Sequence, residues 1–157
     1  MAHCVTGRIL EEEIFCELEV KWDGYMTYRK AMSFALDHQR WNPTDPTTSA
    51  GGDLHAEVAM AIETILGKEI DWTELGMYSA LHTPLDFFHG VDGFFVFRGN
   101  IVTVDVTKNP NKDHYKADLV LQYSDFSRED RDRYDFSLVA GRVAEMLTHP
   151  VAMRADA

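Results

Sequence analysis

Two aspartates stand at the open end of a predicted β-hairpin, where their spacing would let them share a cation. Residues 89–116 (HGVDGFFVFRGNIVTVDVTKNPNKDHYK) contain two apolar runs joined by a tight turn at 98–101. If the loop holds an even number of residues centred on that turn, Asp92 lies opposite Thr107 and diagonal to Asp105. The two carboxylates then share one face of the hairpin, roughly 6–8 Å apart at Cβ. Since buried carboxylates repel one another, this spacing favours a divalent cation with oxygen ligands.

The same residues also have an ordinary structural interpretation. Asp92 and Gly93 can form a turn, and Asp105 can be a hydrogen-bonded strand residue. A three-residue loop would place the two aspartates on opposite faces and remove the metal site.

The apolar pattern of the hairpin predicts where it lies in the fold. Side chains alternate across a strand, so one face is apolar throughout and consists of Gly93, Phe95, Phe97, Val102, Val104 and Val106. The middle of the other face is mostly apolar as well. A hairpin buried on both sides belongs inside a sheet under covering elements. We therefore expect an α/β protein with a central mixed β-sheet flanked by helices on both faces.

Alternation and helical spacing predict the remaining elements along the chain. They are a strand at 14–22, a helix at 26–41, a loop at 42–52, a helix at 54–66 capped by Asp53, a short helix at 71–82 ended by Thr83-Pro84, a strand at 117–123 and a helix from about 127 to 148. We expect residues 1–157 to form a single domain, with a core at 53–149. Residues 1–52 would add an N-terminal strand and helix and a loop.

The overall charge argues against a general affinity for phosphate backbones. The chain of 157 residues carries a formal net charge of −11, so its surface on average repels nucleic acid. Basic side chains nevertheless gather directly after the hairpin, at Lys108, Lys112, His114 and Lys116. A local basic patch beside the aspartates is compatible with a nucleic-acid substrate, while the acidic remainder is compatible with a basic protein partner.

The sequence contains no apolar run long enough to span a bilayer, and its first residues lack the apolar centre of a signal peptide. Two cysteines are too few for a disulfide framework. We expect a cytoplasmic protein with free thiols and no membrane association.

Taken together, the pattern resembles the PD-(D/E)XK nuclease-like superfamily, and its small phage-type members in particular. The shared features are an acid on a helix, a strand that starts at an aspartate, a turn, and a strand that ends in a second acid near a lysine. The resemblance covers residues 53–147. It implies a restriction-endonuclease-like core and a metal-dependent nuclease whose expected substrate is DNA.

Each acid of the family pattern has a counterpart in this chain. Asp92 matches the first acid of the family, although Val91 precedes it, and Asp105 matches the second. Glu57 matches the helix acid, with Glu63 as the fallback. The resemblance implies one Mg²⁺ or Mn²⁺ held by Asp92, Asp105 and the carbonyl of Val106, with Glu57 acting through water or a second ion.

The lysine of the family pattern is displaced in this chain. Its expected position, two residues after Asp105, is occupied by Thr107. Lys108 would orient the attacking water if its long side chain reaches back from the strand end, and Lys112 could supply the charge from the loop.

The displaced lysine and the negative charge keep a second hypothesis open. The chain could be a nuclease-like protein that has lost catalysis and acts by binding, as a phage-type factor that occupies a host enzyme. The acidic run at 125–135 is then the candidate contact.

Overall fold

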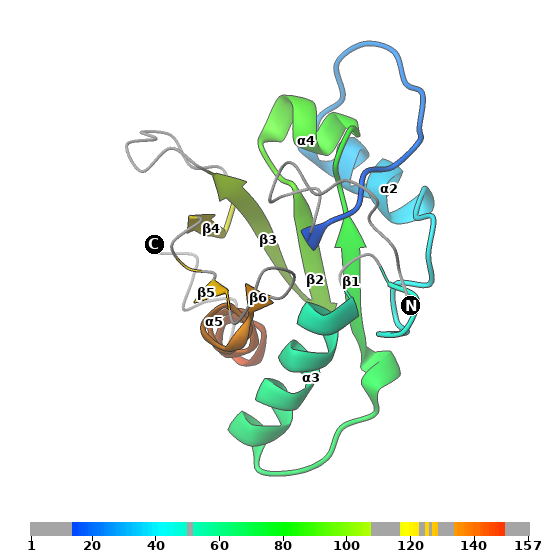
Figure 1. Ribbon diagram of the computed structural model, residues 1–157. Coiled ribbons are helices and arrows are strands. Elements are labelled where there is room, and N and C mark those ends of the chain that lie inside the picture. Colours follow the sequence, from blue (N-terminus) through cyan, green and yellow to red (C-terminus); the bar gives the residue numbers. More distant parts are fainter. Residues whose placement is uncertain are drawn as a thin grey trace.

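The computed structural model describes residues 14–49, 52–107, 117–122, 125, 127–128 and 134–149. In chain order its elements are α2 (Tyr28–Asp37), α3 (Gly52–Leu66), the 3₁₀ helix η1 (Trp72–Glu74), β1 (Leu75–Ser79), α4 (Pro84–His89), β2 (Gly93–Phe97), β3 (Asn100–Thr107), β4 (Leu119–Gln122), β5 (Ser127–Arg128), β6 (Tyr134–Asp135) and α5 (Ser137–Thr148) (Figure 1).

The centre of the structure is a four-stranded mixed sheet with the order β1-β2-β3-β4. β1, β2 and β3 form an antiparallel meander, and β4 pairs with β3 in parallel. β5 and β6 form a separate two-stranded ribbon. The expected α/β class with a mixed central sheet is confirmed.

The central hairpin turns more tightly than expected. Phe97 pairs with Asn100, so the loop holds only Arg98 and Gly99 instead of four residues. Both loop residues have positive φ, 49° and 82°, as in a two-residue turn whose twist matches that of the strands. The register differs from the predicted one by two residues. Because side chains alternate with a period of two, each strand residue keeps its predicted face.

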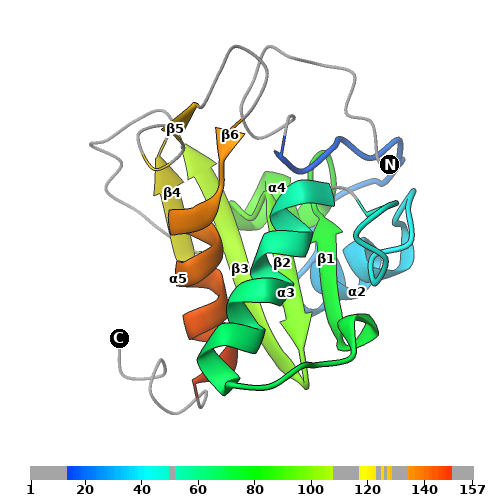
Figure 2. The same ribbon diagram turned by 60° about the horizontal axis from the view of Figure 1, so that its bottom comes forward.

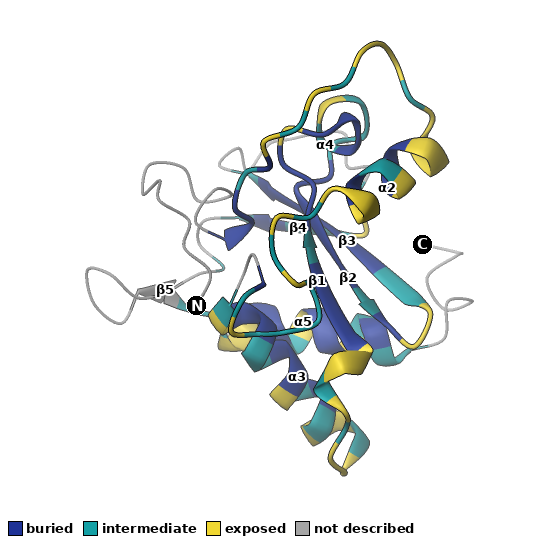
Figure 3. Ribbon diagram, turned by 90° about the vertical axis from the view of Figure 1, so that its right-hand side faces the viewer, coloured by how far each residue is buried: buried dark blue, intermediate teal, exposed yellow. Residues whose placement is uncertain are grey.

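Two apolar clusters contain alternate residues of these strands. In the larger cluster, α3 and α5 pack against the side chains on one face of the hairpin, which include Phe95, Phe97, Val102, Val104 and Val106. Figure 2 shows α3 and α5 side by side across the sheet. In the smaller cluster, α2 and α4 pack against the side chains on the other face, which include Phe94 and the partly buried Val96 and Ile101. Buried residues line the sheet and the inner sides of the helices, whereas exposed residues lie on their outer sides (Figure 3).

The predicted helix at 71–82 is wrong. Asp71 accepts a hydrogen bond from the Thr73 N–H and caps η1, after which the chain enters β1 and pairs with β2. The fully buried Leu75, Met77 and Ser79 alternate along β1, a period that a helix cannot provide.

The Thr83-Pro84 dipeptide begins a helix instead of ending one. The Thr83 hydroxyl accepts a hydrogen bond from the Leu85 N–H, and Pro84 occupies the first turn of α4, where no backbone donor is needed. Gly90 ends α4 with φ of 65°. This short helix places a residue in the candidate site that the sequence analysis did not consider.

Residues 15–22 form neither a helix nor a strand. They run in an extended path beside the end of β1, where the Leu18 N–H donates to the Leu81 carbonyl and the Ser79 hydroxyl donates to the Cys16 carbonyl. Cys16 and Leu18 are buried, as the alternation predicted, but this segment has no β-ladder hydrogen bonds to a neighbouring strand, so the predicted strand is absent. Cys16 is disulfide-bonded, so the expectation of free thiols is wrong for this residue.

The C-terminal helix starts later than predicted. α5 begins at Ser137, after the β5–β6 ribbon, and buries Val139, Val143 and Leu147 against the sheet. Among the described residues, no helix has both the length and the apolar character needed to cross a bilayer.

Candidate functional site

The structure brings Asp92 and Asp105 to the same end of the hairpin. Asp92 directly precedes β2, and its Oδ2 accepts a hydrogen bond of 2.8 Å from the Val106 N–H. The Asp92 backbone N–H donates to the Val104 carbonyl. Asp105 precedes Val106 on β3. Both aspartates are buried, with 6% and 7% of their surfaces exposed. The carboxylate of Asp92 therefore continues the ladder of β2 by one position and cannot turn freely toward solvent.

A third aspartate joins them from α4. The side chain of Asp86 lies close enough to those of Asp92 and Asp105 for both to influence its ionisation. Carboxyl groups gathered in this way disfavour the full ionisation of all three. Asp86, Asp92 and Asp105 are called the aspartate cluster below.

The environment of Asp86 favours its protonated form. Burial raises the pKa of this carboxyl group above its ordinary value, and the negative charge of Asp105 raises it further. The His82 N–H, which donates to Asp86 Oδ2 at 3.0 Å, and the nearby His82 side chain act in the opposite direction. Burial is the largest of these contributions.

Sequence reasoning missed Asp86 because it read Thr83-Pro84 as the end of a helix. The order Thr83-Pro-Leu-Asp86 fits the pattern of a helix start, a threonine followed three residues later by an acid. A proline in the first turn and Gly90 after the last turn complete that signal.

The structure does not gather all the predicted metal ligands. Glu57 lies in the second turn of α3, the helix of the larger apolar cluster, and its Oε2 is buried. Glu63, the fallback acid, accepts a hydrogen bond from the Ile70 N–H and holds the chain after α3. Within the described part of the chain, no three His, Cys, Asp or Glu side chains form a group that could hold a metal ion. Glu57, Asp92 and Asp105 are therefore not a ready-made ligand set.

The predicted cationic side chains are not placed by the structure. Lys108, Lys112 and the other basic residues of 108–116 lie outside the described residues. Thr107, at the position where the family has its lysine, is the last residue of β3 and is half-buried.

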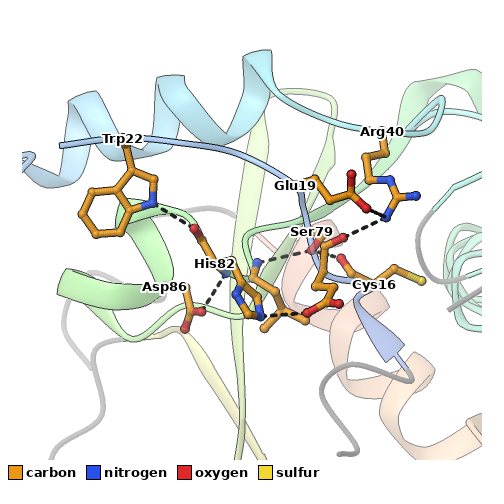
Figure 4. Close-up of polar contacts among 9 residues, drawn as sticks. Cys16, Glu19, Trp22, Arg40, Ser79, His82 and Asp86 are labelled. Carbon is orange, nitrogen blue, oxygen red and sulfur yellow. Dashed lines mark hydrogen bonds and ion pairs between the residues drawn. The ribbon is translucent and has the colours of Figure 1, made fainter. Parts of the chain in front are cut away.

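His82 links the aspartate cluster to the N-terminal segment (Figure 4). Its ring Nε2 lies 3.1 Å from Glu17 Oε2, and its carbonyl accepts a hydrogen bond of 2.9 Å from the Trp22 indole. Its backbone has φ of 70°, in the left-handed region that side chains rarely adopt. Three polar contacts thus hold a strained, exposed histidine beside Asp86.

His55 and Ser49 form a separate polar pair that is fully buried. His55 Nε2 lies 3.0 Å from the Leu75 carbonyl, which can only accept, so Nε2 carries the proton. Nδ1 then accepts from the Ser49 hydroxyl at 2.8 Å. Burial lowers the pKa of His55. Because the hydroxyl is sealed from solvent, this pair fastens the loop before α3 to β1 and offers no accessible nucleophile.

Comparisons with known proteins add no relative to this picture: no protein-family model, curated protein or solved structure matches the chain. The fold and the site themselves define the chain as an α/β protein with an aspartate cluster at one end of its mixed sheet, in which Asp92 and Asp105 are buried and Asp86 is half-buried.

Proposed function

We propose that this protein is a metal-dependent nuclease that hydrolyses phosphodiester bonds, with DNA as its substrate. The observation that carries the proposal is the convergence of Asp86, Asp92 and Asp105 from α4, from the residue before β2 and from β3. A site built only of carboxylate oxygens suits Mg²⁺ or Mn²⁺, although the described side chains do not form a ready-made group of three ligands, so an ion would have to draw these carboxylates together. A bound ion would offset the repulsion among these carboxylates.

Each aspartate has a distinct part in this proposal. Asp92 is held by the Val106 N–H, so it would offer its other oxygen in a fixed direction. Asp105 would add a second buried oxygen donor, and Asp86, in its ionised form, would add a third. The bound ion supplies polarisation of the phosphate and a more acidic water. Lys108 remains the proposed source of positive charge for that water, and Glu57 an outer ligand.

The proposal is tested with the full chain on labelled single-stranded and duplex DNA, in millimolar MnCl₂, MgCl₂ or EDTA. We expect cleavage with either metal and none with EDTA. Asp92→Asn and Asp105→Asn should each lower the rate at least about 100-fold, as loss of a metal ligand usually does. Asp71→Asn is the matched control, because Asp71 is exposed and only caps η1. Full activity in the Asp92 and Asp105 variants would mean that the site lies elsewhere.

A second candidate is a nuclease-like protein that binds a basic partner without catalysis. The net charge of −11 favours it, because such a surface is attracted to basic clefts. The two candidates differ in metal affinity. A rise in melting temperature with millimolar Mn²⁺ in wild type, absent in Asp92→Asn, supports the nuclease, and no rise in either protein supports the binding protein.

A further inference from the structure

Five aromatic side chains gather beside the aspartate cluster, and three of them (Tyr25, Tyr28 and Phe87) are exposed while two (Trp22 and Phe88) are half-buried. Trp22, Tyr25 and Tyr28 come from the segment before and at the start of α2, and Phe87 and Phe88 come from α4; this set is called the aromatic surface. Ring centroids lie 5.0 Å apart for Tyr25 and Phe88, and 5.4 Å apart for Trp22 and Phe88. Phe87 is 71% exposed and Tyr25 67% exposed. Aromatic groups gathered and exposed in this way mark a binding site more often than a solvated face.

The aromatic surface is held in place by polar contacts at its edges. The Trp22 indole donates to the His82 carbonyl, and His89 Nε2 lies 2.9 Å from the Met26 carbonyl. The His89 ring also contacts the rings of Tyr25 and Tyr28. Since these contacts fasten the segment 22–28 to α4, the rings need little reordering to bind a flat ligand.

Positive charge flanks these rings in a chain that is otherwise acidic. Residues 21–30 contain Lys21, Arg29 and Lys30 against the single acid Asp23, a net charge of +2 within a protein of net charge −11. The three basic side chains are exposed, and none has an ion pair within the described part of the chain. These exposed cations favour an anionic ligand along the 21–30 edge of the surface, whereas acids lie at its other edges: Asp86 precedes Phe87, and the charge of Asp118 reaches Tyr28.

The aromatic surface adjoins the aspartate cluster. Asp86 directly precedes Phe87 on α4. A short path of hydrogen bonds runs from the Trp22 indole through His82 to Asp86 (Figure 4). A ligand on the rings would therefore lie next to the carboxylates of the proposed nuclease site.

We propose that the aromatic surface binds single-stranded nucleic acid by stacking its unpaired bases on Tyr25, Phe87 and neighbouring rings. Lys21, Arg29 and Lys30 neutralise the phosphates beside them. Stacking needs an exposed base face, which a duplex keeps covered, so the surface selects single strands. The inference deepens the proposed nuclease by naming its substrate as single-stranded, but binding itself requires neither metal nor cleavage.

Fluorescence anisotropy of a labelled oligo(dT) of about 20 nucleotides measures binding in EDTA, where the proposed metal-dependent cleavage cannot occur. We expect wild type to bind oligo(dT) at least 10-fold more tightly than a duplex of equal length. Phe87→Ala and Tyr25→Ala should each raise Kd roughly 10- to 100-fold. Lys30→Ala should reduce the slope of log Kd against log salt concentration by about 0.7. Leu138→Ala is the matched control, because Leu138 is a large exposed residue, 54% exposed, on α5.

The outcomes separate this inference from the proposed nuclease. Binding in EDTA without cleavage in Mn²⁺ would support the aromatic surface and refute the nuclease. Cleavage with unchanged Kd in Phe87→Ala and Tyr25→Ala would refute the aromatic surface and leave the nuclease standing. Equal affinity for duplex and oligo(dT) would also overturn the inference. So would binding of an oligo-arginine peptide in place of oligo(dT), which would indicate a basic protein partner. Circular dichroism confirms that each variant is folded.

Discussion

The buried His55 should lower the stability of this protein as the pH is lowered below about 7. The substitution His55→Gln should remove this part of the pH dependence. Burial lowers the pKa of His55, so the native state keeps the ring neutral where the unfolded chain, with the ordinary value of 6.5, takes up a proton. Below that pH the unfolded state binds more protons than the native state, and acid favours unfolding. The stability present above pH 6.5 is therefore lost progressively as the pH falls toward the native pKa of His55.

The size of the effect follows from linkage for one proton. For as long as the native ring stays neutral, lowering the pH from 7.5 to 5.5 costs about 1.4 kcal/mol, with 6.5 as the unfolded pKa. In a chain of 157 residues this corresponds to a fall of about 3–6 °C in Tm. The native ring resists protonation because burial lowers the pKa of His55, and this effect outweighs the hydrogen bond to the Leu75 carbonyl and the charge of Asp45, which both raise it. A proton on Nδ1 would reverse the bond with Ser49, whose oxygen would then accept, and would place a positive charge in a buried site.

Urea denaturation followed by tryptophan fluorescence at pH 7.5, 6.5 and 5.5 measures the effect in wild type and His55→Gln. The glutamine can accept and donate but does not titrate, and the six other histidines are present in both proteins. We expect wild type to lose about 1.4 kcal/mol more than His55→Gln over this range. His55→Leu should lower the free energy of unfolding by about 2–5 kcal/mol at every pH, because it leaves the buried Ser49 hydroxyl and Leu75 carbonyl without their hydrogen-bond partner. Equal pH dependence in wild type and His55→Gln would refute the reasoning.

Two further predictions concern the ends of the aspartate cluster. Asp86→Asn should stabilise the protein at pH 7.5. Burial raises the pKa of Asp86, so its ionised form opposes folding as the pH rises through that pKa. The gain in stability should vanish below the ordinary pKa of 3.8, where the carboxyl group is neutral in both the native and the unfolded state. Lower stability of the variant in urea at pH 7.5 would contradict this. Gly93→Ala should destabilise by about 1–3 kcal/mol or more, because its Cβ would lie 2.2 Å from the buried ring of Phe15. In a double-mutant cycle with Phe15→Ala most of that penalty should disappear, and full additivity would show that the clash is not its cause.

The hairpin was the most predictable part of the fold, and the reason is local. Apolar residues alternate on both sides of the turn at Arg98 and Gly99, so the strands and their faces follow from side-chain period alone. The register did not follow, because a two-residue and a four-residue loop give the same face pattern. Left-handed backbone at Arg98 selects the shorter loop, and its sequence is weak evidence for that conformation.

The segment 71–90 shows where local reasoning fails. Its apolar residues fit a helix nearly as well as a strand, and only pairing with β2 makes Leu75–Ser79 an edge strand. The error propagated, because a helix that ended at Thr83-Pro84 left no room for α4. Asp86 was therefore absent from the candidate site, although its capping pattern was present in the sequence.

By itself the sequence determined the α/β class, the burial of the hairpin and the presence of Asp92 and Asp105 at its end, because each depends on spacing within one short segment. The tertiary structure alone decided that Asp86 lies beside them and that, among the described residues, neither Asp86 nor Glu57 completes a ready-made ligand set with them. It alone also decided that rings from residues 22–28 and 87–88 meet on one surface. Those contacts join residues about 60 positions apart, and their formation depends on the packing of α4 and of the chain before α2, which no local pattern encodes.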